Sequence, residues 1–229
     1  MTDELTPPTS GFGDLAHSTL KGLLGEFPGG STAAEVLAFF FGSPIETRRQ
    51  KFYEAVVHAL KELQQRGVDV VSICKDPVFV DTVVNAVRVA MSTSQQEKLD
   101  ALRNAILNSG LPRAPEPDLR QMFLGMIDRF TGWHLRLLSM FDDPIGHFRS
   151  MRKDLPRHIS PFALLDFAAI AFPELESRQD FAEQICADLQ QAGLLFRADS
   201  SITRIMLEAE SPRTTNLGKQ FVQFVRMPE

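Results

Sequence analysis

The sequence predicts a mainly α fold: an N-terminal multi-helix bundle, then a small C-terminal module with a short β-hairpin. Apolar residues recur every three to four positions along most of the 229-residue chain, as they do on one face of a helix. Helix start signals recur too, because residues 32–35 and 94–97 fit capping boxes and Pro77 follows a capping Asp76. The hydrophobic fraction of 44% is typical of a chain that buries a core.

The first 42 residues predict a tail and a helical hairpin. Residues 1–12 have little to bury, so we expect a disordered tail, and residues 13–42 hold two helical stretches separated by Pro28-Gly29-Gly30. The second arm ends in a run that is apolar on all sides. Packing against the bundle is the simplest interpretation, and a dimer surface or reversible membrane attachment are the alternatives. The residues that would meet an apolar partner or a membrane are Leu37, Phe39, Phe40 and Phe41.

The rest of the bundle extends to residue 143. Helices are expected from Ser43 to Gly67, from Asp76 to Met91 and from Ser94 to Gly110, with a short apolar segment at 70–74. The prolines of residues 112–117 form a linker. One apolar stripe then runs from about Asp118 to Phe141 and predicts the longest helix of the chain.

Residues 144–157 form the most basic stretch and predict a connector between the bundle and the module. Four cations stand against the single acid Asp154, which gives a net charge of +3. This connector could contact nucleic acid or an acidic protein, or it could simply be solvated. The residues proposed for such contacts, with two from the C-terminal module, are Arg149, Arg152, Lys153, Arg157, Arg213 and Lys219.

The C-terminal module begins at residue 158. Helical patterns at 160–172 and 177–192 precede a short apolar strand at 194–196, a polar hairpin-like stretch at 198–212 and a last helix after residue 216. This order, with "DLQQAGLL" before the hairpin and "TTNLGKQF" after it, resembles a winged-helix domain. The resemblance implies either DNA binding or a plain protein-binding role. The helix at 177–192 carries Arg178 against three acids, a net charge of −2, which opposes contact with phosphates.

The whole chain also resembles a set of uncharacterised bacterial helical proteins. The matching segments are "SPIETRRQKF", "EKLDALRNAILN", "TGWHLRLL" and "TTNLGKQF". No chemistry is attached to that set, so the resemblance implies no catalytic residues.

A search for catalytic, metal-binding and phosphate-binding motifs finds none. The five histidines are scattered, and the spacings of zinc sites, phosphate loops and nucleophile elbows are absent. We therefore predict no enzyme activity, no cofactor and no metal. Cys74 and Cys186 are expected to be buried thiols in a reducing compartment, and the N-terminus lacks a secretion signal, so a cytoplasmic location is expected.

One polar grouping crosses the predicted helices. Asn104 and Asn108 are four residues apart and share a helix face, and Arg103 and Asn104 could meet polar residues of the long helix. A hydrogen-bonded network that fixes helix register is the simplest interpretation, and a polar pocket is the alternative. The proposed network comprises Arg103, Asn104, Asn108, Asp128, Thr131 and His134.

These observations predict a non-enzymatic interaction or scaffold protein that binds another protein or a second copy of itself. One alternative is a DNA-binding regulator that uses the connector and the wing. The other is a membrane-associating stress or defence effector that acts through residues 13–42.

Overall fold

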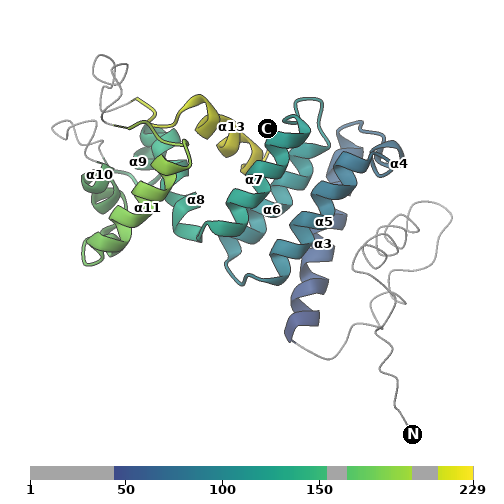
Figure 1. Ribbon diagram of the computed structural model, residues 1–229, viewed down its shortest axis with the longest axis horizontal. Coiled ribbons are helices and arrows are strands. Elements are labelled where there is room, and N and C mark those ends of the chain that lie inside the picture. The colour runs from purple at the N-terminus through teal and green to yellow at the C-terminus, as the bar shows by residue number, and fades with distance from the viewer. Residues whose placement is uncertain (1–43, 154–163, 198–210, 229) are drawn as a thin grey trace, which may run out of the picture. The chain divides into compact units, whose positions relative to one another are not determined.

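The computed structural model describes residues 44–153, 164–197 and 211–228, and these are mainly helical, as the sequence predicts (Figure 1). The tail and hairpin expected at 1–42, with Leu37 and Phe39 to Phe41, lie outside the described residues, as does most of the expected β-hairpin at 198–212. The helices are α3 (Pro44–Gln65), α4 (Val70–Ile73), α5 (Pro77–Met91), α6 (Gln96–Ser109), α7 (Pro117–Arg129), α8 (Gly132–Asp142), α9 (Pro144–Ser150), α10 (Leu164–Ala171), the 3₁₀ turn η1 (Pro173–Leu175), α11 (Gln179–Gln191) and α13 (Asn216–Val225).

The chain divides into two compact units. Unit 1 comprises Met1–Thr93 and Ala105–Leu124, and unit 2 comprises Ser94–Asn104 and Gly125–Glu229. The predicted division placed the boundary at residues 144–157, which lie inside unit 2. The expected connector is also partly helical, because α9 occupies Pro144–Ser150 and buries Phe148 to 1% exposure.

Unit 1 is organised around the pair of helices α3 and α5, which lie side by side in Figure 1. Apolar residues at helical spacing, among them Phe52 and Val83, are buried in this unit. Gly67 ends α3 with a positive φ of 82°, a conformation that glycine adopts without strain. At the other end of the pair, Arg48 Nη1 donates to the carbonyl of Met91 at 3.2 Å and so satisfies a carbonyl at the end of α5.

Unit 2 is organised around α8, which packs against α9, α11 and α13. Its buried side chains are mostly aromatic and aliphatic, and Phe141, Phe167 and Phe221 have no accessible surface. The first turn of α13 lies against the backbone at Leu194, where Thr215 N donates to the Leu194 carbonyl at 2.9 Å. α8 therefore sits at the centre of the elements that shape the site described below.

The single long helix predicted from Asp118 to Phe141 is wrong. The helix is interrupted at Phe130 and Thr131, so that α7 ends at Arg129 and α8 begins at Gly132. Thr131 takes an extended conformation and caps α8, and this cap outweighs the continuous apolar stripe.

The strand expected at 194–196 is also not regular. Within the described ranges it is reduced to an isolated antiparallel bridge between Leu195 and Thr214. Phe196 N donates to the Arg213 carbonyl at 3.0 Å, beside the Thr215 to Leu194 bond. Two chain segments therefore meet here without forming a strand ladder.

Candidate functional site

Two of the predicted network residues, Thr131 and His134, meet at the start of α8. The backbone N–H of Thr131 donates to His134 Nδ1 at 3.1 Å, and Thr131 Oγ1 lies 2.9 Å from the same nitrogen. His134 thus takes the place that Glu or Gln holds in an ordinary capping box. Its ring stacks on Phe130 at 4.8 Å between centroids, and its Nε2 lies 3.2 Å from Asp188 Oδ2 on α11.

These contacts fix which ring nitrogen of His134 carries the proton. A backbone N–H can only donate, so Nδ1 carries a lone pair and Nε2 carries the proton that faces Asp188. Burial lowers the pKa of His134, although Asp188 opposes this change. A cavity of about 420 Å³ borders His134 and Asp188, but both groups already bind each other. The cluster therefore serves to cap α8 and to hold α11 against it.

Other members of the predicted network have partners elsewhere. Asn104 Nδ2 donates to the carbonyl of Val225 at 3.0 Å, near the end of α13, and Arg103 donates to Asn104 and to the sulfur of Met227. Asp128 contributes its backbone carbonyl, which accepts from Lys98 Nζ at 2.9 Å. Asn108 belongs to unit 1, whereas the other predicted members belong to unit 2. That all six residues form one network that fixes the register of the helices stays a prediction.

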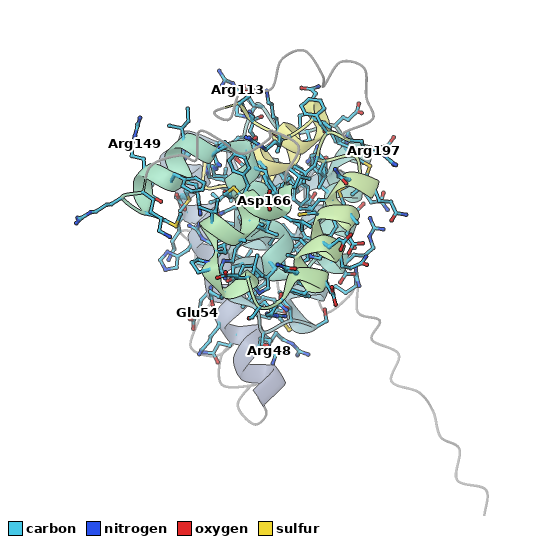
Figure 2. The ribbon with its side chains drawn as sticks, turned by 90° about the vertical axis from the view of Figure 1, so that its left-hand side faces the viewer. Arg48, Glu54, Arg113, Arg149, Asp166 and Arg197 are labelled. Carbon is cyan, nitrogen blue, oxygen red and sulfur yellow. The ribbon has the colours of Figure 1, made fainter. Side chains whose placement is uncertain are left out.

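Four of the residues predicted to contact nucleic acid lie on the surface. Arg149, Arg152, Lys153 and Lys219 are exposed, and Arg157 lies outside the described residues. Figure 2 shows Arg149 on one side of unit 2 and Arg197 on the other, with the acidic Asp166 of α10 in view between them. Contact of the exposed predicted cations with nucleic acid stays a prediction.

Arg213 was predicted as a surface contact, and this is wrong because the residue is 1% exposed. Its guanidinium lies over the ring of Phe167 at 4.1 Å, and Nη1 donates to the carbonyl of Ser211. Burial lowers the pKa of Arg213 to about 10, so the group stays charged at neutral pH. The planar cation thus belongs to the interior of unit 2.

A cavity of about 460 Å³ opens beside α8, and we call it the α8 pocket. Its volume falls in the range of ligand-binding pockets. Seven of its lining residues are apolar, and the polar ones include charges of both signs. The apolar residues are Ala101, Leu135, Leu138, Phe172, Phe221, Val222 and Val225, and the polar ones are Glu97, Asp100, Arg136, Ser139, His147 and Arg226.

Arg136 is held in place by two aromatic rings at this pocket. Its guanidinium lies 4.1 Å from the centroid of Trp133 and 4.8 Å from that of Phe172. One nitrogen, Nη2, also donates to Glu174 Oε1 at 3.1 Å. A hydrogen bond from its own backbone lowers the pKa of Glu174, and the contact with Arg136 lowers it further. The Glu174 side chain is 51% exposed, so the ion pair is a weak one.

His147 brings an unsatisfied polar atom to the same pocket. Its Nε2 is buried and has no hydrogen-bond partner in the part of the chain that the structure describes, and its ring lies 5.0 Å from that of Phe172. Burial lowers the pKa of His147, and the positive charge of Arg136 lowers it further, against the opposing effect of Asp143. The imidazole is therefore neutral at pH 7, and either ring nitrogen can carry the proton.

The two acids of the pocket already have intramolecular roles. Asp100 accepts from Gln96 Nε2 at 2.8 Å. The carboxylate of Glu97 lies against the first residue of α8, since a Cβ added at Gly132 would stand 2.9 Å from Glu97 Oε2. A carboxylate at that position is stabilised by the N-terminus of the helix.

The pocket residues Arg136 and Phe172 are not among the residues predicted from the sequence, and His147 is predicted only as part of a basic stretch. The three-residue spacing of Trp133 and Arg136 was a usable signal, because it places both on one helix face. Phe172 lies 36 positions further along, and no periodicity connects it to them. Cys74 and Cys186 are buried as predicted, and burial raises their pKa values to about 11 and about 12.

No group of three or more His, Cys, Asp or Glu residues in the described part of the chain could hold a metal ion. None of the helices in those ranges is long and apolar enough to span a bilayer.

Comparison with known proteins gave no match to any family model, curated protein or solved structure.

Proposed function

We propose that this chain is a non-enzymatic protein-binding protein whose α8 pocket receives an apolar side chain of a polypeptide partner. One observation carries the proposal: a cavity of about 460 Å³ combines an apolar lining with charged groups of both signs. Apolar anchors in pockets surrounded by polar groups supply most of the affinity of protein interfaces. The size of the pocket suits a large side chain with part of the adjoining backbone.

The arrangement at His134 supports the non-enzymatic part of the proposal. Thr131, His134 and Asp188 resemble a nucleophile, a base and an acid in their order of contact. The lone pair of His134 Nδ1 is nevertheless engaged by the backbone N–H of Thr131, so it is poorly placed to take the hydroxyl proton. The set acts as a helix cap.

The nucleic-acid alternative has less support than protein binding. Burial of Arg213 removes one cation from the proposed contact set. The membrane alternative depends on residues 13–42, which are outside the described ranges.

The winged-helix-like architecture also remains a proposal for the C-terminal third. Two helices, α10 and α11, precede a bridge between Leu195 and Thr214, and α13 follows it. This order matches the predicted one, in which two helices precede a pair of chain segments and a final helix follows them. Most of the wing expected at 198–212 lies outside the described residues.

The test of protein binding uses a library of random short peptides displayed on phage and selected on the full chain. Ser139 lines the pocket but is exposed, so Ser139→Trp can fill the cavity without displacing a core side chain. Selected peptides should bind the wild-type chain, and Ser139→Trp should weaken them by at least about tenfold, as the loss of an anchor does. Fluorescence anisotropy with synthetic peptides measures the affinities.

Ala187→Trp is the matched control. It places the same indole at an exposed helical position on α11, and Ala187 does not line the α8 pocket. This variant should bind the peptides as the wild type does. If no peptide distinguishes Ser139→Trp from Ala187→Trp, the proposed function is wrong.

A further inference from the structure

We infer that the α8 pocket recognises an acidic–apolar peptide, in which a carboxylate lies next to the apolar side chain that enters the cavity. The carboxylate binds at the corner formed by Arg136 and His147, here called the basic corner. This inference rests on the proposed function and names the chemistry of the partner.

The first argument is the unsatisfied nitrogen of His147. Its Nε2 is buried and has no partner among the described residues, and its imidazole belongs to a residue that lines the pocket, so a ligand atom can recover the free energy that this nitrogen costs. The neutral imidazole can carry its proton on Nε2, because no hydrogen bond fixes the other tautomer. A ligand oxygen that accepts this proton satisfies the nitrogen.

The second argument is the orientation of Arg136. Trp133 and Phe172 hold its guanidinium at 4.1 and 4.8 Å, so little side-chain freedom is lost when a ligand binds. A guanidinium has five N–H donors, and Glu174 takes one of them from a largely exposed position. The remaining donors form a planar fork that suits a carboxylate.

The two acids of the pocket decide whether the ligand group should carry a negative or a positive charge. Asp100 accepts from Gln96, and Glu97 lies at the N-terminus of α8. Both carboxylates therefore have stabilising partners within the chain. Unused hydrogen-bonding capacity lies at the basic corner, so an anionic group on the ligand gains more there than a cationic group gains at the acids.

The apolar part of the pocket adjoins this corner through Phe172. The ring of Phe172 contacts both Arg136 and His147 and also lines the cavity. A ligand with its carboxylate at the corner therefore has its neighbouring side chain beside Phe172. Acidic and apolar groups must accordingly be adjacent in the peptide.

The experiment is a double-mutant cycle on a peptide from the selection described above. The peptide is made with its acid and with the matching amide, and each form is bound to the wild-type full chain and to Arg136→Met. Methionine retains much of the apolar contact with the rings but has no N–H donors on its side chain. The acid peptide should lose about tenfold in affinity on Arg136→Met, the size of one charge-assisted hydrogen bond, and the amide peptide should change less than about twofold.

Three further variants test the same corner. His147→Leu should weaken the acid peptide, and His147→Gln, which keeps a donor, should restore most of the loss. Glu174→Gln removes the competing carboxylate and should strengthen the acid peptide. Arg178→Met is the matched control, because Arg178 also lies over a ring, Phe181 at 4.0 Å, but does not line the pocket. Thermal unfolding by circular dichroism confirms that each variant folds.

The outcomes separate the two proposals. Peptides that depend on the pocket but bind equally well as acid and amide would overturn the basic corner and leave the proposed function standing. If no selected peptide depends on the pocket, both proposals fail. An acid-specific loss that also appears with Arg178→Met would contradict the role of Arg136.

Discussion

The two units differ in how they satisfy their buried polar side chains. In unit 1, the hydroxyls of Thr82 and Ser109 donate to carbonyls four residues earlier in their own helices. In unit 2, three buried polar groups have partners that are distant in sequence. Lys98 donates to the Asp128 carbonyl, His134 meets Asp188, and Thr214 donates to Asp142.

This difference indicates which unit depends on particular contacts between segments that are distant in sequence. A hydroxyl that bonds within its own helix needs no particular neighbour, so these two hydroxyls add little to how the helices of unit 1 are arranged. A buried group with a distant partner costs free energy whenever the two segments separate. Unit 2 therefore needs a more closely defined arrangement, and it also contains the α8 pocket.

The largest expected effect comes from two glycines, one in each unit. A Cβ at Gly218 would overlap the backbone carbonyl of Leu194, which cannot move without breaking the contact with α13. A Cβ at Gly110 would stand 2.5 Å from Leu63 Cδ1, the far end of a flexible side chain. We expect Gly218→Ala to cost about 3 kcal/mol of unfolding free energy and Gly110→Ala about 1 kcal/mol or less.

Urea unfolding followed by circular dichroism measures both losses. Alanine lowers the entropy of the unfolded chain equally at the two positions, so the comparison isolates the native-state clash. Equal losses would show that the backbone contact at Leu194 yields as easily as a leucine side chain. The close approach of α13 would then not distinguish unit 2.

A smaller effect is expected from two buried threonines. Thr214→Val and Thr82→Val remove one hydroxyl each with little change in shape. Thr214 Oγ1 donates to Asp142 Oδ1 at 2.8 Å, so its loss leaves a largely buried carboxylate with one donor fewer. We expect a cost of about 2 kcal/mol for Thr214→Val and less than about 0.5 kcal/mol for Thr82→Val.

The same unfolding measurement checks this pair. Thr82 donates to the carbonyl of Val78, which lies in the same helix, α5. Removal of the hydroxyl therefore leaves no charged group without a hydrogen-bond donor. If Thr82→Val proved as costly as Thr214→Val, local and distant hydrogen bonds would be equivalent, and the contrast between the units would fail.

Sequence reasoning recovered those features that depend on local pattern. The helices α3, α5 and α6 begin near their predicted caps, and the glycine at 67 ends α3. These outcomes follow from helical periodicity and from the hydrogen bonds of the first and last turns, which involve neighbours in the chain. The mainly α class follows from the same signals.

Features that depend on distant partners were not predictable. The break between α7 and α8 requires a cap at Thr131 in which His134 replaces the usual Glu or Gln. Arg213 is buried because Phe167, 46 positions earlier, offers its ring. The α8 pocket draws on α6, α8, α9 and α13, so no single stretch of sequence carries its signature.

The smallest expected effect concerns pH and His134. Burial lowers the pKa of His134 below its ordinary value of 6.5, with Lys98 adding to this and Asp188 opposing it. As pH falls through 6.5, the unfolded chain therefore takes up this proton before the folded chain does. The stability that a neutral His134 provides is complete above pH 6.5 and is lost progressively until the pH passes the folded-state pKa.

His134→Gln tests this expectation, because glutamine supplies the usual capping-box acceptor but does not titrate. The variant loses the stacking on Phe130, which lowers its stability by a similar amount at every pH. His147 also has a lowered pKa and contributes to the same window in both proteins, so only the difference in slope is informative. Between about pH 7.5 and pH 5, the unfolding free energy of the wild type should fall more steeply than that of His134→Gln. Parallel pH profiles would mean that His134 takes up its proton equally readily in the folded and unfolded chains, and the polar pairing of unit 2 would then not include an effect of protonation.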